Sequence, residues 1–412
     1  MDVLTIVYLT YSFVSFYFLF FYLLIYIPHR KEFHSIPKPE RVYSLSIVVP
    51  CYNEEDDIGG TIEALLKSDY KGLKKIIIVD DCSKDNSWKI IQDYAKKYEK
   101  VMGVQTPKNS GKASGAKNYG AKYAHTELIG FTDGDSYPEQ NAISNMIGFF
   151  NNPKVGAVAS SVFVKRRNTF LEKIQSIEYK MIAFARKLLG YVDAIYVTPG
   201  PLAVYRKDAF DKIGGFDEKN MTEDIEITWA FVKAGYKAEM SYESIVYSVA
   251  PDKIKPWLKQ RIRWNIGGIQ TISKYKQYFG SNRVGMLGKF ILPYFIFNWV
   301  LGVCGFLILL YRLARTVFIK YLATTYSLQT QTALVTFRDI NLTPSILFFF
   351  GVASIAMNFV IVSIALTRAK REDKYMGPGI PSILFYFFVY ILFYPIILFT
   401  SIYKFFRGKY TW

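Results

Sequence analysis

The sequence has few cysteines and no motif typical of nucleic-acid binding. Its three cysteines, Cys51, Cys82 and Cys304, show no paired or metal-type spacing, so we interpret them as reduced structural thiols. The formal net charge of +17 would suit nucleic acid, but no recognised binding motif accompanies it. Lysine and arginine gather instead beside apolar segments, where anionic lipid headgroups attract them. We therefore predict that these basic residues bind membrane lipids and that the protein does not bind nucleic acid.

Apolar residues dominate both ends of the chain. With 51% hydrophobic residues, including 32 Tyr and 33 Phe, the sequence is too apolar at its ends and too polar in its middle for one soluble domain. Residues 1–28 are about long enough to cross a hydrocarbon core of roughly 30 Å. Cleavage as a signal peptide is not expected, because the run is too long and lacks a basic start and a small-residue cleavage site. Arg30 and Lys31 follow directly, so the positive-inside rule places the next segment in the cytoplasm.

Three further apolar stretches lie in the C-terminal region, residues 286–412. They are residues 290–311, 346–366 and 380–403. A basic connection between the last two marks another cytoplasmic loop, and the whole pattern predicts a multi-pass protein of the cell membrane with about four spans. Pro381 and Pro395 allow the last stretch to be kinked or re-entrant. The motif Asn341-Leu-Thr343 in the predicted outer loop is a candidate N-glycosylation site.

The middle of the chain, residues 45–250, follows a linker at 29–44 and alternates short β-branched runs with helical patterns. This alternation is typical of an α/β fold with a mostly parallel sheet. Residues 45–49 and 75–79 are predicted strands, and each is followed by polar side chains. Ligands in open α/β sheets bind beyond the carboxyl ends of the strands, so both polar ends should face one crevice.

Two groups near these strand ends are candidate ligands for a nucleotide. Asp80 and Asp81 can accept hydrogen bonds from a base or a ribose, although helix capping and turn formation would explain them equally well. The glycine-rich segment 108–115 contains Lys112, which can reach a phosphate, but its glycine spacing is not that of a P-loop. A surface loop with a solvated lysine is the alternative interpretation of this segment.

The short apolar run 128–131 precedes Asp133-Gly-Asp135, which places two carboxylates two residues apart. Mg²⁺ typically binds through one or two carboxylates plus substrate phosphates, and Gly134 lets the turn fold tightly. An Asp-Gly turn closing a hairpin is the alternative.

Two later segments combine apolar residues at helical spacing with basic ones, at about residues 168–190 and 251–285. The first carries Lys173, Lys180, Arg186 and Lys187. We expect both to be amphipathic helices that lie along the cytoplasmic leaflet. The second contains Gln260-Arg-Ile-Arg263-Trp264, and a basic membrane-surface helix with no catalytic role is its alternative interpretation.

Taken in order, these segments resemble the membrane-integrated family 2 glycosyltransferases, which include cellulose, chitin, hyaluronan and poly-N-acetylglucosamine synthases. The resemblance covers about residues 45–270. The segments that carry it are Val48-Val-Pro-Cys-Tyr-Asn-Glu54, Val79-Asp-Asp81, Lys112, Asp133-Gly-Asp135, Gly200-Pro-Leu-Ala-Val-Tyr205-Arg206, Thr222-Glu-Asp224 and Gln260-Arg-Ile-Arg-Trp264. It implies a GT-A type nucleotide-sugar-binding domain inserted between the transmembrane helices. The residues after Asp224 look closer to the poly-N-acetylglucosamine type than to the hyaluronan or chitin type.

The resemblance also implies roles for individual residues. Asp224 would be the general base, with Glu223 and Thr222 beside it. Asp135, with Asp133, would hold Mg²⁺ or Mn²⁺ on the donor diphosphate. The other donor-binding residues would be Pro50, Tyr52, Glu54, Asp80, Asp81, Lys112, Asp133, Gln260, Arg263 and Trp264, and the acceptor-binding residues would be Gly200, Pro201, Tyr205 and Trp264. Thr222 also suits a helix N-cap, with Glu223 and Asp224 as first-turn acids.

The implied activity is inverting transfer of a sugar from a nucleotide sugar, a UDP-sugar in most of the family, to a growing β-linked polysaccharide that is exported. Transfer of a single sugar to a membrane lipid, such as a polyprenyl phosphate or a ceramide-like acceptor, remains the alternative. A non-catalytic scaffold is disfavoured, because every acidic residue that the chemistry needs is present. About four spans are few for a complete export channel, which leaves a homo-oligomer or an accessory subunit open.

Overall fold

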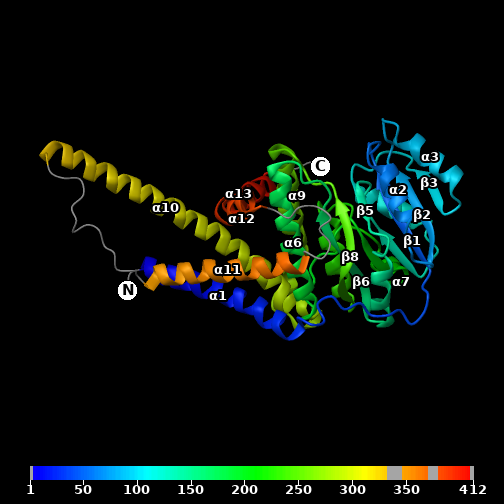
Figure 1. Cartoon of the computed structure of the whole chain (residues 1–412), viewed down its shortest axis with the longest axis horizontal. Helices are drawn as coiled ribbons and strands as arrows, with labels where there is room; N and C mark the ends of the chain where they lie inside the picture. The colour runs from blue at the N-terminus through cyan, green and yellow to red at the C-terminus, as the bar shows by residue number, and fades with distance from the viewer. Residues whose placement is uncertain (1–2, 332–345, 370–378, 409–412) are drawn as a thin grey trace.

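The computed structural model describes residues 3–331, 346–369 and 379–408. A globular α/β part lies at one end of the molecule, and long apolar helices extend from it (Figure 1). The candidate glycosylation motif at 341–343, and most of the basic connection between the last two apolar stretches, lie outside the described residues.

The α/β part is built on one eight-stranded sheet in the order β3-β2-β1-β4-β7-β6-β8-β5. Its strands are β1 (Leu45–Cys51), β2 (Leu73–Asp80), β3 (Val101–Gln105), β4 (Leu128–Phe131), β5 (Ser136–Pro138), β6 (Val155–Val164), β7 (Ala203–Arg206) and β8 (Lys237–Ser248). The first four strands are mutually parallel, β6 and β8 are parallel, and β7 and β5 run antiparallel to their neighbours. The predicted mostly parallel sheet is therefore confirmed.

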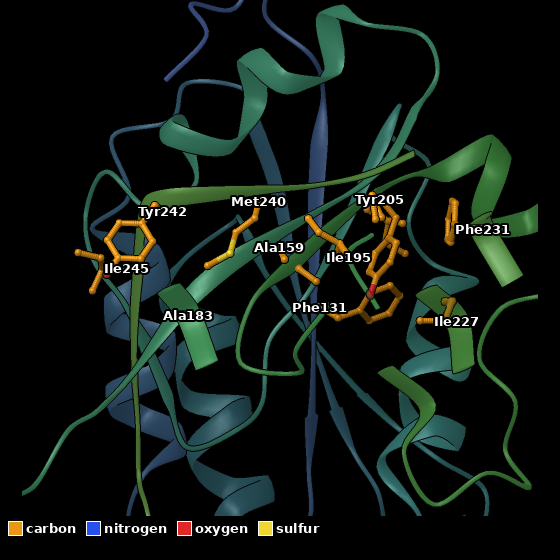
Figure 2. Close-up of a cluster of buried hydrophobic side chains, with 14 of the residues drawn as sticks. Phe131, Ala159, Ala183, Ile195, Tyr205, Ile227, Phe231, Met240, Tyr242 and Ile245 are labelled. Carbon is orange, nitrogen blue, oxygen red and sulfur yellow. The ribbon is translucent and has the colours of Figure 1, made fainter. Parts of the chain in front are cut away.

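Helices cover both faces of the sheet. They are α2 (Ile58–Leu66), α3 (Ser87–Lys97), α4 (Ala113–Ala121), α5 (Ser144–Ile147), α6 (Phe170–Gly190), α7 (Lys207–Ile213), α8 (Glu223–Lys233) and α9 (Ile254–Tyr275). Alternate residues of a strand point to opposite faces, so Ile76 and Ile78 join the core beneath α2 and α3 while Ile77 and Val79 join the core on the other face. That second core includes Tyr205 of β7 and Phe231 of α8 (Figure 2).

Helix α6 differs from the amphipathic surface helix that the sequence predicts. Three of the basic side chains expected to face lipid headgroups, Lys180, Arg186 and Lys187, are only 2%, 5% and 7% exposed. The reason is that α6 packs against β6 and β8 and also against the long apolar helices α1 and α11. Its first turn is fixed by a capping box between Thr169 and Glu172.

The apolar helices are α1 (Val3–His29), α10 (Leu292–Thr330), α11 (Ile346–Ala369) and the pair α12 (Ile380–Phe385) and α13 (Ile391–Phe406). Three helices of the described chain are long and apolar enough to cross a membrane, and the bent pair would make four. The pair is bent by 45°, which is compatible with both the kinked and the re-entrant arrangement that its prolines allow. Helix α10 is 39 residues long, well beyond the predicted 290–311, and its distal half extends away from the other helices (Figure 1).

Candidate active site

One cavity of about 730 Å³ brings together the end of β1, the loop after β4, the start of α8 and the middle of α9. The predicted site residues that line it are Pro50, Tyr52, Glu54, Asp81, Lys112, Asp133, Asp135, Gly200, Pro201, Thr222, Glu223, Asp224, Gln260, Arg263 and Trp264. Within the described part of the chain, Asp80 and Tyr205 are the predicted site residues that do not line it. Segments separated by more than a hundred residues thus converge on one crevice, as the strand-end argument predicts.

A lysine absent from the sequence prediction joins the two acidic segments of this cavity. Lys117, on α4, is 2% exposed, and its Nζ lies 3.1 Å from Asp133 Oδ1 and 2.9 Å from Glu223 Oε1. The signal that would have identified it is local: the buried positions of α4 are otherwise small residues, and a lysine stands among them. A buried charge of this kind requires partners, and here both partners belong to the candidate site.

The two carboxyl groups at the start of α8, Glu223 and Asp224, have pKa values shifted in opposite directions. Burial alone would raise the pKa of Glu223, but the ammonium of Lys117 outweighs it and lowers that pKa. Burial raises the pKa of Asp224 to about 6, and the negative charge of Glu223 adds to the shift. Thr222 is the N-cap residue of α8, although its side chain makes no capping hydrogen bond. Asp224 is therefore the carboxylate in this pair that is suited to accept a proton.

The acids after β4 form a site that fits a divalent cation. Burial raises the pKa of Asp135 to about 7, with Asp133 adding to the shift, and burial together with the charge of Asp135 raises the pKa of Glu54 to about 7. Such raised pKa values indicate carboxyl groups with too little positive charge close to them. No group of three or more His, Cys, Asp or Glu side chains in the described residues is arranged to hold a metal. Two carboxylates plus phosphates remain a common Mg²⁺ environment.

The residues predicted to bind a nucleotide, Asp80, Asp81 and Lys112, form hydrogen bonds with segments around the cavity. Asp81 accepts hydrogen bonds from Thr106 Oγ1 at 2.7 Å and from the Ser110 amide at 2.9 Å. Asp80 is fully buried; one of its oxygens accepts from Gln105 at 2.7 Å, and the other has no protein partner. Lys112 Nζ donates to the carbonyl oxygens of residues 218–220, so in this structure it holds the loop that precedes α8.

The segment after α6 approaches the β4 loop closely. A Cβ atom on Gly200 would lie 2.6 Å from Asp133 Oδ2, so the absence of a side chain allows the backbone to pass beside that carboxylate. Tyr205, further along the same segment, is 1% exposed and its hydroxyl lies 2.7 Å from Thr198 Oγ1 (Figure 2 labels Tyr205). The structure thus places Gly200 and Pro201 on the cavity and Tyr205 in the core behind it.

Helix α9 presents Gln260, Arg263 and Trp264 to the cavity. Between them, Arg261 turns away, is 1% exposed and forms an ion pair with Glu178 of α6. Its guanidinium also lies 4.1 Å from the centre of the Trp264 ring and donates to Gln260 Oε1 at 2.7 Å. The buried residue of the motif therefore orients two of the residues that face the cavity.

The mostly parallel sheet has the GT-A-like fold that the sequence predicts. Residues 46–214 match the family model for glycosyl transferase family 2. This part of the chain is therefore similar to family 2 glycosyltransferases, in agreement with the resemblance found in the sequence.

Similar proteins include polysaccharide synthases and a mannosyltransferase. The chain is 27% identical over 321 residues to a poly-beta-1,6-N-acetyl-D-glucosamine synthase of Staphylococcus epidermidis, covering 75% of this chain and 77% of that protein. A synthase of the same name from Staphylococcus aureus is 27% identical over 288 residues, covering 68% and 69%. The fold also matches a mannosyltransferase from Pyrobaculum calidifontis, solved with GDP-Man and Mn²⁺, with a TM-score of 0.60 at 16% identity over 97% of this chain and 99% of that one.

Proposed function

We propose that this protein is an inverting glycosyltransferase that uses UDP-N-acetylglucosamine to build a β-linked polysaccharide at the membrane and export it. The curated relatives support the donor and the polymer, because they are named as N-acetylglucosamine polymer synthases and align over about two thirds or more of both chains. The observation that carries the proposal is the single cavity in which Asp224, Asp133, Asp135 and the α9 motif meet.

On the acceptor side, Asp224 takes the proton from the attacking hydroxyl. Its pKa of about 6 leaves it mostly ionised at neutral pH while keeping it a stronger base than an exposed aspartate. Attack in a single displacement inverts the anomeric centre, so an α-linked donor gives a β-linked product. Lys117 keeps Glu223 ionised beside this base and fixes its position relative to Asp133.

On the donor side, Asp133 and Asp135 would hold Mg²⁺ or Mn²⁺. When bound, that ion offsets negative charge on the leaving diphosphate. Arg263 and Gln260 contact the same diphosphate, because a guanidinium forms paired hydrogen bonds with phosphate oxygens. Trp264 offers a flat apolar face to the acceptor sugar. Tyr52 and Glu54 at the end of β1 complete the donor pocket.

The catalytic domain would face the cytoplasm, where nucleotide sugars are made. The basic residues after α1 support this orientation through the positive-inside rule. The helices that pack against α6 would then position the cavity at the membrane surface.

The test uses purified protein in lipid nanodiscs with radiolabelled UDP-sugars and Mg²⁺ or Mn²⁺, with products separated by size. A high-molecular-weight product from UDP-N-acetylglucosamine is expected. A donor preference for another sugar, or label confined to short lipid-soluble products, would contradict the proposed polymer.

Asp224→Asn tests the base directly. We expect turnover to fall by at least about 100-fold, the usual contribution of a general base, while nucleotide-sugar binding is retained. Asp93→Asn on the exposed face of α3 is the matched control and should leave turnover unchanged. Unchanged turnover of the Asp224 variant would remove Asp224 from the role of base.

A further inference from the structure

The loop that carries the proposed metal carboxylates is held by α2, a helix that contains none of the predicted site residues. The hydroxyl of Thr61 on this helix donates a hydrogen bond of 2.7 Å to the carbonyl oxygen of Gly134, the residue between Asp133 and Asp135. Thr61 is fully buried, and Gly134 is buried as well. A buried carbonyl oxygen that loses its donor pays the cost of desolvation, so the position of this carbonyl depends on Thr61.

Gly134 makes this hydrogen bond important for the direction of Asp135. A Cβ atom on Gly134 would lie 3.1 Å from the carbonyl oxygen of Pro50, so a side chain there would crowd the end of β1. Glycine also gives the backbone more conformational freedom than any other residue. Rotation of the peptide that follows Gly134 would turn the backbone from which the Asp135 side chain projects. Thr61 holds the carbonyl of that peptide and so limits the rotation.

Tyr137 ties the strand after the loop to the same helix. This strand, β5, is the last of the sheet and pairs with β8. The Tyr137 hydroxyl donates a hydrogen bond to Oδ1 of Asp57, the N-cap residue of α2. A Cβ atom on Gly60 would lie 2.7 Å from Cε1 of Tyr137, so the ring lies directly against the backbone of α2. Asp135 therefore stands between two contacts with one helix, the first at Gly134 and the second at Tyr137.

The two carboxylates of the loop are fixed from different helices. Lys117 of α4 contacts the carboxylate of Asp133. Around Asp135 the contacts come from α2 and act on the neighbouring residues of the loop. Metal ligands in proteins are commonly oriented by hydrogen bonds of this kind, and their loss typically weakens metal affinity or activity by about 10- to 100-fold.

We propose that Thr61 is a positioning residue for the divalent cation of the donor site, with Tyr137 as a second anchor. By holding the Gly134 carbonyl, Thr61 keeps Asp135 in the arrangement with Asp133 that the cation requires. The inference rests on the proposed function and deepens it, because it names residues behind the cavity wall that set the affinity for the metal. Loss of the Thr61 hydroxyl weakens metal binding and leaves both carboxylates in the chain.

Binding of Mn²⁺ in the presence of UDP tests the proposal without requiring turnover. The purified full chain in lipid nanodiscs is titrated with Mn²⁺, and the electron paramagnetic resonance signal of the free ion gives the dissociation constant. Thr61→Val keeps the shape of the side chain and removes the hydroxyl, so the dissociation constant should rise at least about tenfold. Thr61→Ser keeps the donor and should restore the wild-type affinity. Tyr137→Phe removes the second anchor and should weaken binding by about threefold, as expected for one hydrogen bond.

The matched control is Ser244→Ala in β8. Ser244 is also fully buried, and its hydroxyl donates a hydrogen bond of the same length, 2.7 Å, to the carbonyl oxygen of Ala142. Its loss should lower thermal stability about as much as Thr61→Val does and should leave the affinity for Mn²⁺ unchanged. Wild-type affinity in Thr61→Val, or an equal loss of affinity in Ser244→Ala, would overturn the proposal. If Thr61→Val does not fold, Tyr137→Phe decides, and unchanged affinity in that variant overturns the proposal.

The dependence of turnover on the metal gives a second readout. A weakened metal site should raise the Mn²⁺ concentration at which Thr61→Val reaches half of its maximal rate, and saturating Mn²⁺ should recover most of the wild-type rate. The same fractional loss of rate at every Mn²⁺ concentration would mean that Thr61 acts on folding alone, which would also overturn the proposal.

Failure of the proposed function gives a different result. The wild-type protein would then transfer sugar from none of the UDP-sugars, whatever affinity it showed for Mn²⁺. Conversely, sugar transfer by a wild-type protein that binds Mn²⁺ no more tightly than Thr61→Val would support the glycosyltransferase function and refute the positioning role.

Discussion

Lys117 shows how much of this site depends on one side chain. Its ammonium stands between Asp133 of the proposed donor side and Glu223 of the proposed acceptor side, and it is almost fully buried. Burial alone would lower the pKa of Lys117, but the two carboxylates raise it, so the lysine stays charged. A single cation therefore joins the two acidic segments to which we assign the donor and acceptor roles.

Lys117→Met should leave two buried acids without their counter-charge. Breaking a buried ion pair by removing one partner typically costs about 3–5 kcal/mol, so we expect a clear drop in thermal stability and loss of turnover. The control is Lys122→Met, an exposed residue just after the same helix, which should change stability by no more than about 0.5 kcal/mol. Equal stability of the two variants in a detergent unfolding assay would contradict the role of Lys117 as the counter-charge of both Asp133 and Glu223.

The raised pKa of Asp224 predicts the pH dependence of the reaction. The proposed general base must be deprotonated to act, so activity should be nearly full at neutral pH and should fall as the pH drops through about 6, the pKa of the Asp224 carboxyl group. A normal aspartate would instead lose activity near pH 4. The measurement is kcat against pH at saturating donor. An acidic limb near pH 4 would show that burial and Glu223 do not act on Asp224 as described.

Among the elements, two strands were predicted correctly and the environment of the helices was not. The strands predicted at 45–49 and 75–79 extend by two to three residues into β1 and β2, and the apolar run 128–131, for which no strand was predicted, forms β4. The expected basic face of α6 is buried, because apolar helices α1 and α11 pack against this helix in addition to the sheet. A local sequence pattern does not reveal such neighbours. Lys117 was missed although it stands among small residues, because its partner Glu223 lies 106 residues further along the chain and local spacing does not identify that partner.

The contact between α8 and α9 can be tested through Gly267. A Cβ atom there would lie 2.0 Å from Thr222 Oγ1, so Gly267→Ala should push α9 away from the start of α8 and displace the residues that line the cavity. A displacement of about 1 Å can cost about 100-fold in rate, and we expect kcat to fall by up to that factor. Gly302→Ala in α10, where the nearest atom is 4.0 Å away, is the control. Equal rates for both variants would show that this contact does not position the motif.

At the scale of the whole molecule, one buried network ties the catalytic domain to the C-terminal helices. Glu178 of α6 pairs with Arg261 of α9 and accepts hydrogen bonds from Tyr390, at 2.8 Å, and from Tyr394. Trp257 of α9 in turn donates to the Tyr390 hydroxyl at 2.9 Å. The helix that carries the cavity-facing motif is thus held between α6 and α13, and its orientation depends on a bent apolar segment more than a hundred residues away.

A double-mutant cycle on Glu178 and Arg261 tests this coupling. Glu178→Gln leaves the guanidinium buried without a counter-charge, and Arg261→Met leaves the carboxylate unpaired, so each change alone should destabilise the protein by about 3–5 kcal/mol. The double variant removes both charges and should be clearly more stable than the sum of the single effects predicts, because contacting residues couple. Arg261→Met should also lower turnover, since it releases Gln260 and Trp264 from the guanidinium that orients them. Strictly additive changes in stability, measured by thermal unfolding, would mean that the pair does not join α9 to α6. This network would then not couple the bent C-terminal helices to the candidate active site.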